Sequence, residues 1–485
     1  MLGITGFGAY IPQLRLPRSA IVNANVWANP SIAHLSTGER SMANWDEDSI
    51  TMAVEAARNC LHNIDRDHVK KVSFASTTFP FVDRLNSGVV SSALNLPNDS
   101  HSADLTGSQK AGTSSLISAL ESTMKDSKDL HLCIAAEKRL ARAGSLQELS
   151  FGDGAAALTL GNSSNNVILA ELIGHHSITD DFVDHYRAQG NKFSYYWEER
   201  WIKEEGYLKL IPESINRLLE NCSVKANQID HLIVPLSSRG VPQRIASATD
   251  ISPEIISDNL WNDCGDTGTA HPLIMLASEL EKAKPEKKIL VCGFGQGADT
   301  ILLQTTKAIS DFQSRQSLSD SLTNRREQNN YLKFLTFNGL LEVERGMRAE
   351  QDKQTALSAL YRNKDMLLGF IGGHCQKCGT SQIPKTRICV NPNCGAHNSQ
   401  TDERFSDKKA NVMSWTADQL AYSIDPPAHY GMVEFEGGGR LMVDFTDVNT
   451  DEMETNMPVR MVFRIKDIDE QRGFVRYFWK ASPYK

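Results

Sequence analysis

The chain of 485 residues has no long apolar run, no block of basic residues and no leader-like N-terminus. Because a membrane-spanning helix needs about 18 consecutive apolar residues, the first absence argues against a membrane-spanning protein. A formal net charge of −8, without a lysine- and arginine-rich stretch, argues against a nucleic-acid partner. The start, "MLGITGFGAYIPQLRL", lacks the charged and apolar regions of a signal peptide, so we expect a cytoplasmic protein.

The composition is that of an ordinary globular protein, with 40% hydrophobic and 23% charged residues. The length favours two to four domains. Of the nine cysteines, five are scattered through mostly apolar segments, as is typical of reduced core thiols: Cys60, Cys133, Cys222, Cys264 and Cys292. Together with the odd count, this distribution indicates a reducing compartment.

The other four cysteines are clustered in "GGHCQKCGTSQIPKTRICVNPNCGAH". Cys375 and Cys378 are spaced as one knuckle, and Cys389 and Cys394 as a second. Two such pairs can close a tetrahedral thiolate site around zinc. Because four thiolates leave no position for water, we expect the zinc to be structural. Two disulfides or unliganded thiols are the alternative, which the expected compartment disfavours.

Strand and helix signals alternate over the first three hundred residues, which predicts an α/β fold. The pattern occurs twice. "GSQKAGTSSLISALE", "LHLCIAAE" and "FGDGAAALTLG" in the first half correspond to "CGDTGTAHPLIMLASELE", "KKILVCGFG" and "GQGADTILLQ" in the second. The glycine turns before "AAALTL" and "ADTILL" open into strand-like runs rather than helices, so we do not expect dinucleotide or ATP loops there.

The stretch from Ser102 to Glu121, "SADLTGSQKAGTSSLISALE", predicts a strand, a glycine turn and a helix. Enzymes often place a nucleophile at such a strand–turn–helix elbow. The helix N-terminus lowers a thiol's pKa there, and free N–H groups can stabilise an oxyanion. This elbow has no cysteine and presents Gln109 and Lys110 instead.

The chain changes character after residue 305. Residues 306–364 are polar and charged, which indicates a partly helical connector. After the cysteine cluster, about five short β-rich segments such as "YGMVEFEGGGRLMVDFTDV" and "GFVRYFWKA" are typical of a small barrel.

These motifs, taken in order, resemble a known group. "KAGT" at 110–113, "FGDGAAAL" at 151–158 and "GDTGTAHP" at 265–272 are similar to hydroxymethylglutaryl-CoA synthase and ketoacyl synthase III of the thiolase superfamily. Residues 365–485 resemble the zinc-ribbon and OB-fold accessory domain of thiolase-type enzymes. The resemblance implies a duplicated αβαβα fold, a homodimer, and coenzyme A thioesters as substrates.

On this basis we expect five parts. Residues 1–162 and 163–305 form the two thiolase-like halves, and residues 306–364 form the connector. Residues 365–400 form the zinc ribbon and residues 401–485 the OB-fold barrel.

The resemblance breaks at four functional positions. Gln109 stands where the resemblance places the acylated cysteine, and Thr77 stands where it places an acid. Around Pro235 no histidine follows the expected strand, and Asp266 replaces the asparagine of the second elbow. A carboxamide is not a useful nucleophile, so these changes argue against acyl-enzyme chemistry.

The remaining candidates are open to two interpretations each. Gln109 could orient a substrate carbonyl. Asp266 is either a base whose pKa burial raises, or a helix cap. His271 is either a catalytic residue or a histidine packed in the core. Ser108 would be a weak covalent nucleophile, because no histidine stands beside it. Arg239 and Arg244 either hold the coenzyme A phosphates or form a solvated loop face.

Three functions compete. The first is an acyl-CoA enzyme for non-covalent carbon–carbon bond formation, cleavage or acyl transfer. The second is an ordinary hydroxymethylglutaryl-CoA synthase, which the lost residues disfavour. The third is a non-catalytic subunit that binds or channels acyl-CoA and docks a thiolase-type partner protein through the zinc and OB module. OB folds also bind single-stranded nucleic acid, but the acidic chain disfavours that role here.

Overall fold

A computed structural model describes residues 1–123 and 127–484 of the chain. It divides into two compact units. The first comprises residues 1–44, 48–91 and 96–341, and the second comprises residues 45–47, 92–95 and 342–485. Within the described residues, no helix is both long and apolar enough to cross a membrane. The finer boundaries expected from the sequence stay predictions.

The first unit is built on a mixed sheet in the order β11-β12-β13-β8-β1-β7-β6-β4-β5. Strands β6 and β7 read as continuous buried runs because helices cover both of their faces. The strands are β1 (Leu2–Tyr10), β4 (Val69–Ala75), β5 (His101–Leu105), β6 (Leu130–Lys138), β7 (Asp153–Asn162), β8 (Ala170–Thr179), β11 (His231–Ile233), β12 (Lys288–Phe294) and β13 (Gly297–Thr305).

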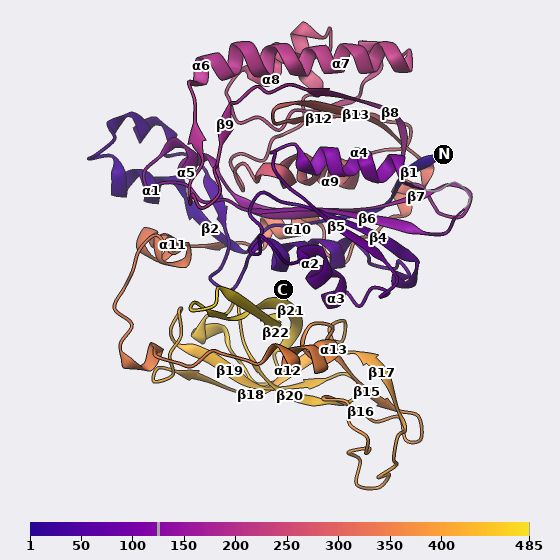
Figure 1. Cartoon of the computed structure of the whole chain (residues 1–485), viewed down its shortest axis with the longest axis vertical. Coiled ribbons are helices and arrows are strands. Elements are labelled where there is room, and N and C mark those ends of the chain that lie inside the picture. The colour runs from indigo at the N-terminus through magenta and orange to yellow at the C-terminus, as the bar shows by residue number, and fades with distance from the viewer. Residues whose placement is uncertain (124–126, 485) are drawn as a thin grey trace. The chain divides into compact units, whose positions relative to one another are not determined.

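Helices divide this unit into five layers (Figure 1). Helices α4 (Ala111–Glu121) and α9 (His271–Lys282) lie in the middle and contact strands of both sheet halves. Helix α2 (Ser49–Cys60) covers β1, β6 and β7, and α7 (Leu208–Cys222) covers β8 and β13. The predicted αβαβα thiolase fold is therefore confirmed.

The internal repeat is also present in three dimensions. Helix α4 leads into β6, which pairs antiparallel with β7, and α9 leads into β12, which pairs antiparallel with β13. Both glycine turns open directly into strands, β7 and β13, as predicted. Smaller elements complete the unit: β2 (Leu14–Pro17), β3 (Glu39–Met42), β9 (His185–Tyr186), β10 (Tyr195–Tyr196), β14 (Arg326–Glu327), α1 (Arg18–Asn25), α5 (Leu146–Ser150), α6 (Glu199–Trp201), α8 (Val241–Ala248), α10 (Leu318–Thr323) and α11 (Tyr331–Phe337).

The second unit contains two small sheets and short helices. Strands β15 (Ile371–Cys375), β16 (Ser381–Gln382) and β17 (Gln400–Arg404) carry the cysteine knuckles. Five antiparallel strands form the barrel, whose ends meet where Phe445 bridges Ala481. These are β18 (Ala410–Asp418), β19 (Ala428–Phe435), β20 (Arg440–Asp444), β21 (Pro458–Asp469) and β22 (Phe474–Pro483). Helix α3 (Asn86–Ala93) has residues in both units, because the boundary falls after residue 91. Helices α12 (Leu357–Arg362) and α13 (Lys364–Leu367) come before β15 in the chain.

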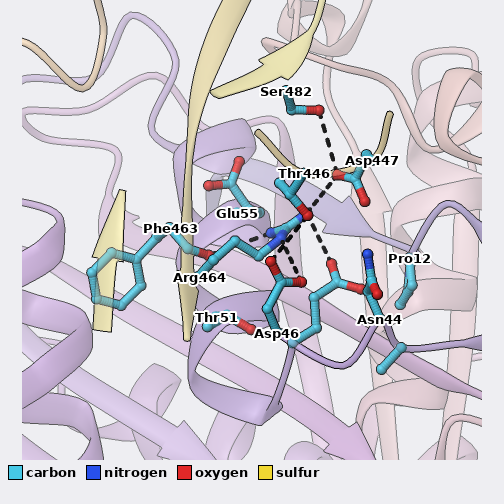
Figure 2. Close-up of polar contacts among 12 residues, drawn as sticks. Pro12, Asn44, Asp46, Thr51, Glu55, Thr446, Asp447, Phe463, Arg464 and Ser482 are labelled. Carbon is cyan, nitrogen blue, oxygen red and sulfur yellow. Dashed lines mark hydrogen bonds and ion pairs between the residues drawn. The ribbon is translucent and has the colours of Figure 1, made fainter. Parts of the chain in front are cut away.

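A buried charge cluster lies in the second unit, which includes the short segment 45–47 (Figure 2). The Asp46 carboxylate lies 2.8 Å from Lys480 Nζ and 3.7 Å from Arg464 Nε. Arg464 also lies 3.0 Å from Glu47 and 2.9 Å from Asp447. Burial opposes ionisation of Asp46, but Lys480 and Arg464 outweigh it and lower the pKa of Asp46. Asp46 therefore stays ionised at neutral pH.

Candidate active site

The two glycine-containing turns that lead into α4 and α9, residues 107–113 and 265–271, contact each other, and we call them the first and second elbow. A Cβ on Gly112, in the first turn of α4, would lie 2.1 Å from the carbonyl oxygen of Thr269 in the second elbow. A Cβ on Gly268 would lie 2.8 Å from Gln109 Oε1. Gly268 also has a φ of 60°, which side-chain-bearing residues rarely adopt. Only glycines at these positions let the two elbows pack backbone against backbone.

A pocket of about 820 Å³ opens at this junction. Gln109, Asp266 and Gly268 reach it from the elbows. Its walls combine aromatic and aliphatic side chains with polar and charged ones, a mixture that suits an organic ligand with polar groups. The apolar lining consists of Leu35, Leu146, Phe151, Tyr196, Trp197, Ile202, Tyr207, Pro235, Leu236, Trp261, Pro272 and Phe294.

Asp266 is paired with Arg139, which follows β6 in the other half of the repeat. Arg139 Nη1 lies 3.0 Å from Asp266 Oδ2, and Asp266 Oδ1 accepts from the Gly268 amide at 2.8 Å. Burial opposes ionisation of Asp266, but Arg139, His271 and the Gly268 amide outweigh it and lower its pKa. The expectation that burial raises the pKa of Asp266 is therefore wrong, because the sequence did not reveal Arg139 as its partner.

Arg139 is held on several sides. Its Nη2 donates to Tyr196 Oη at 3.0 Å, and its guanidinium lies 3.5 Å from the centre of the Phe151 ring. Burial opposes its charge, but Asp266, Tyr196 and Glu137 outweigh burial and raise the pKa of Arg139. The pocket therefore contains a fixed positive charge.

The orientation of Gln109 is set by a chain of hydrogen bonds. Its Nε2 donates to Thr77 Oγ1 at 3.1 Å, and the Thr77 hydroxyl donates to Glu137 Oε1 at 3.0 Å. One of the two amide hydrogens of Gln109 is thus used in the bond to Thr77, and the other can be donated to a substrate carbonyl. Its Oε1 is buried without a hydrogen-bond partner among the described residues.

Glu137, at the end of β6, is an acid that the sequence reasoning missed. Its fully buried carboxylate accepts from the Thr77 amide at 2.7 Å, from Thr78 Oγ1 at 2.7 Å and from Thr269 Oγ1. It joins Thr77 to the second elbow. A single acid closing the apolar run "LHLCIAAE" was the signal that could have revealed it.

His185 and Asp184 also line the pocket and were not predicted individually. They belong to the aromatic and charged loop "DDFVDHYRAQGNKFSYYWEERW". An aromatic and charged composition is suited to the entrance of a pocket, and Tyr196 and Trp197 of the same loop line the pocket as well.

The structure does not bring every predicted residue to this pocket. Ser108 donates its hydroxyl to Gly295 O at 2.8 Å. His271 is buried beside Thr267, and burial lowers its pKa despite Asp266 nearby. Exposed Arg244 forms a two-pronged ion pair with Glu204 at 2.9 and 3.1 Å. Of the described lining residues, Gln109, Asp266 and Arg239 come from the predicted set.

The four clustered cysteines form a second candidate site. The sulfur atoms of Cys375, Cys378, Cys389 and Cys394 lie within 4.8 Å of one another. Cys378 and Cys389 are 3.5 Å apart, and Cys375 and Cys394 are 4.0 Å apart. Zinc–sulfur bonds of about 2.3 Å in a tetrahedron place sulfurs about 3.8 Å apart, so this donor set fits a structural zinc ion. All four cysteines are free thiols in the structure.

Two families match parts of the chain. Residues 219–302 match the family described as 3-oxoacyl-(acyl carrier protein) synthase III C terminal. Residues 403–464 match the C-terminal OB-fold domain of ChsH2.

The chain is also similar to curated hydroxymethylglutaryl-CoA synthases. It is 28% identical over 320 residues to the Archaeoglobus fulgidus protein, covering 64% of this chain and 91% of that protein. It is 27% identical over 352 residues to the Methanobrevibacter smithii protein, covering 71% of this chain and 100% of that protein.

Solved structures share the fold. An HMG-CoA synthase complexed with CoA aligns with a TM-score of 0.60 at 15% identity, covering 83% of this chain and 99% of that chain. The 3-oxoacyl-(acyl carrier protein) synthase III of Pseudomonas aeruginosa aligns with a TM-score of 0.56 at 20% identity, covering 63% of this chain and 98% of that chain. The first unit is thus similar in sequence to hydroxymethylglutaryl-CoA synthases and shares the fold of these enzymes and of 3-oxoacyl synthase III, and residues 403–464 match an OB-fold domain.

Proposed function

We propose that this protein is an acyl-CoA enzyme that makes or breaks a carbon–carbon bond, or transfers an acyl group, without forming an acyl-enzyme. The observation that carries the proposal is the junction of the two elbows. The pocket at this junction is lined by Gln109 from the first elbow and Asp266 from the second. Arg139, which pairs with Asp266, adds a positive charge to the lining. The similarity to hydroxymethylglutaryl-CoA synthases supports a coenzyme A thioester as the ligand.

The absence of a covalent step is supported by the nucleophiles available. The described lining of the pocket includes no cysteine. Cys264, beside the second elbow, is fully buried, and burial raises its pKa to about 12. The Ser108 hydroxyl donates to a backbone carbonyl, so it is poorly placed to attack a thioester.

Catalysis would instead rest on polarising the bound thioester. Removal of a proton beside a thioester carbonyl places negative charge on its oxygen, and preorganised donors lower the energy of that charge. Arg139 and the free amide hydrogen of Gln109 are such donors. With its lowered pKa, Asp266 is suited to hold Arg139 in place rather than to remove a carbon-bound proton.

The remaining roles are also proposals. Arg239 at the pocket would bind coenzyme A phosphates, whereas Arg244 is already paired with Glu204. The zinc would stabilise the second unit. We also expect a homodimer, which is what the resemblance to thiolase-superfamily enzymes implies.

A second candidate function is a non-catalytic subunit that binds or channels acyl-CoA. It is favoured by the match of residues 403–464 to the OB-fold domain of ChsH2, which suggests a docking module for a thiolase-type partner protein.

One experiment separates the two candidates. Acetyl-, hexanoyl- and phenylacetyl-CoA are titrated against the full chain by calorimetry and incubated with it in D2O. Mass spectrometry then follows deuterium entering the carbon next to the thioester. An enzyme binds at least one thioester and accelerates the exchange. A channelling subunit binds without acceleration, and failure to bind any thioester contradicts both functions.

A further inference from the structure

The hairpin of β9 and β10 presents one histidine to the pocket. His185 on β9 pairs directly with Tyr196 on β10, so both side chains project from the same face. Their neighbours Tyr186 and Tyr195 project from the opposite face and are 53% and 54% exposed. His185 and Tyr196 both line the pocket, together with Asp184.

The imidazole of His185 is fixed from two directions. It stacks on the Tyr196 ring with centroids 5.0 Å apart and planes 11° from parallel. Its Nδ1 lies 2.9 Å from Asp184 Oδ2, and the two side chains are only 12% and 9% exposed. Gln296 Nε2 donates to the other Asp184 oxygen at 3.0 Å, which holds the carboxylate in place.

This arrangement distinguishes the two ring nitrogens. The 2.9 Å contact lacks hydrogen-bond geometry, but the Asp184 carboxylate repels a lone pair on Nδ1 and so favours the tautomer with the proton on that nitrogen. Nε2 then carries the lone pair. Nε2 makes no hydrogen bond to the residues that the structure describes, and the ring lines the pocket.

We propose that His185 is the proton-transferring residue of this pocket, with Asp184 as its positioning residue. The inference rests on the proposed function. The alternatives at the pocket are poorer bases at neutral pH. Asp266 is held ionised by Arg139, and burial raises the pKa of Tyr196 and Tyr207, which keeps both phenols protonated. His34 lines the pocket but is exposed.

The step balances without an external reagent. Nε2 takes a proton from the carbon next to the thioester carbonyl. The C–H electron pair becomes the carbon–carbon double bond of an enolate, and the carbonyl oxygen takes the negative charge. The enolate carbon attacks the carbonyl of a second substrate, and the imidazolium returns its proton to the new alkoxide. Bond cleavage is the reverse sequence.

The test is deuterium exchange into acetyl-, hexanoyl- and phenylacetyl-CoA, measured on the full chain and three variants. His185→Gln should lower the exchange rate by about 100-fold or more, because a general base contributes about that factor or more. The control His62→Gln, at an exposed histidine outside the described lining of the pocket, should change it by less than about twofold, because that side chain cannot reach the substrate. Thioester affinity, measured by calorimetry, should stay within about threefold in both variants, which also reports that they fold.

Asp184→Asn tests the positioning role by separating rate from affinity. Without the carboxylate the His185 ring is less firmly oriented, so the exchange rate should fall by about tenfold or more while thioester affinity stays within about threefold. An exchange rate that Asp184→Asn leaves unchanged contradicts that role.

The outcomes distinguish the two proposals. Undiminished exchange by His185→Gln overturns the assignment of His185 and leaves the proposed function standing. A wild-type chain that binds thioesters but does not accelerate exchange refutes both the proton-transfer role of His185 and the proposed enzymatic function. A chain that binds no thioester refutes the proposed function, and the base with it.

Discussion

Arg139 Nη1 lies 3.0 Å from Asp266 Oδ2, in an ion pair that lines the pocket and joins the two halves of the repeat in the first unit. Each half contributes one charge, so the pair exists only when both halves are folded together. It fixes a positive charge beside Gln109 and the second elbow. The pair is therefore both a structural link and the electrostatic centre of the proposed site.

Removing either charge of this pair should lower the free energy of unfolding, and the two losses should not be additive. Arg139→Gln leaves Asp266 without its counter-ion and should lower the free energy of unfolding by about 3 kcal/mol. This is the lower end for buried pairs because the Asp266 side chain is 26% exposed. Asp266→Asn keeps the shape and removes the charge. Chemical denaturation of both single variants and the double variant isolates the pair, and strictly additive losses would contradict the coupling.

The contact between the elbows should tolerate no side chain. Gly112→Ala places a methyl group 2.1 Å from the Thr269 carbonyl oxygen, which the backbone can relieve only by moving. We expect a loss of about 1–3 kcal/mol and a matching loss of thioester binding. Gly88→Ala is the matched control, because its nearest neighbour is the flexible Leu85 side chain at 3.2 Å. Equal effects of the two substitutions would exclude a close contact at Gly112.

The buried Asp46 should make the second unit sensitive to acid. Asp46→Asn leaves Lys480 and Arg464 without their counter-ion and should cost about 3–5 kcal/mol at neutral pH. The folded pKa of Asp46 lies below its ordinary value, so its contribution is complete above about pH 4 and is lost as the pH falls further. Unfolding free energies of wild type and variant should therefore converge at low pH. A difference that is independent of pH contradicts the assigned charge.

The four-cysteine site should hold zinc and stabilise only the second unit. Metal analysis of the purified chain should find about one zinc ion per chain. Cys375→Ser should release it and unfold the second unit, whereas Cys264→Ser, at a buried thiol of the first unit, should leave the zinc in place. Thioester binding by the first unit should survive the loss of zinc. Metal-free wild-type protein with an intact second unit would exclude a structural zinc.

The sequence predicted the fold because its motifs are local. Each glycine elbow and the cysteine cluster lie within a short stretch of chain, and each copy of the helix–strand–strand order is continuous in the sequence. The partners that control charge are not local. Arg139 and Asp266 are far apart in the chain, as are Asp46 and Lys480, and no spacing rule connects them. The pKa of Asp266 was therefore predicted in the wrong direction.

The same limit applies to the candidate site. Gln109, Asp266 and Arg239 were found from positions within motifs, and the structure places all three at the pocket. Glu137 and His185 come from a strand end and a loop that carry no motif. Their importance depends on which elements pack beside them, which only the folded chain reveals.

The central claim is that the pocket polarises a thioester without being acylated by it. The most direct measurement is incubation of the full chain with radiolabelled acetyl-CoA, followed by denaturation and counting of protein-bound label. Gln109→Cys, which places a thiol on the elbow, serves as the variant in which label could be trapped. We predict no stable label on the wild-type protein, and label recovered on a wild-type peptide that contains Ser108 or any cysteine would contradict the account.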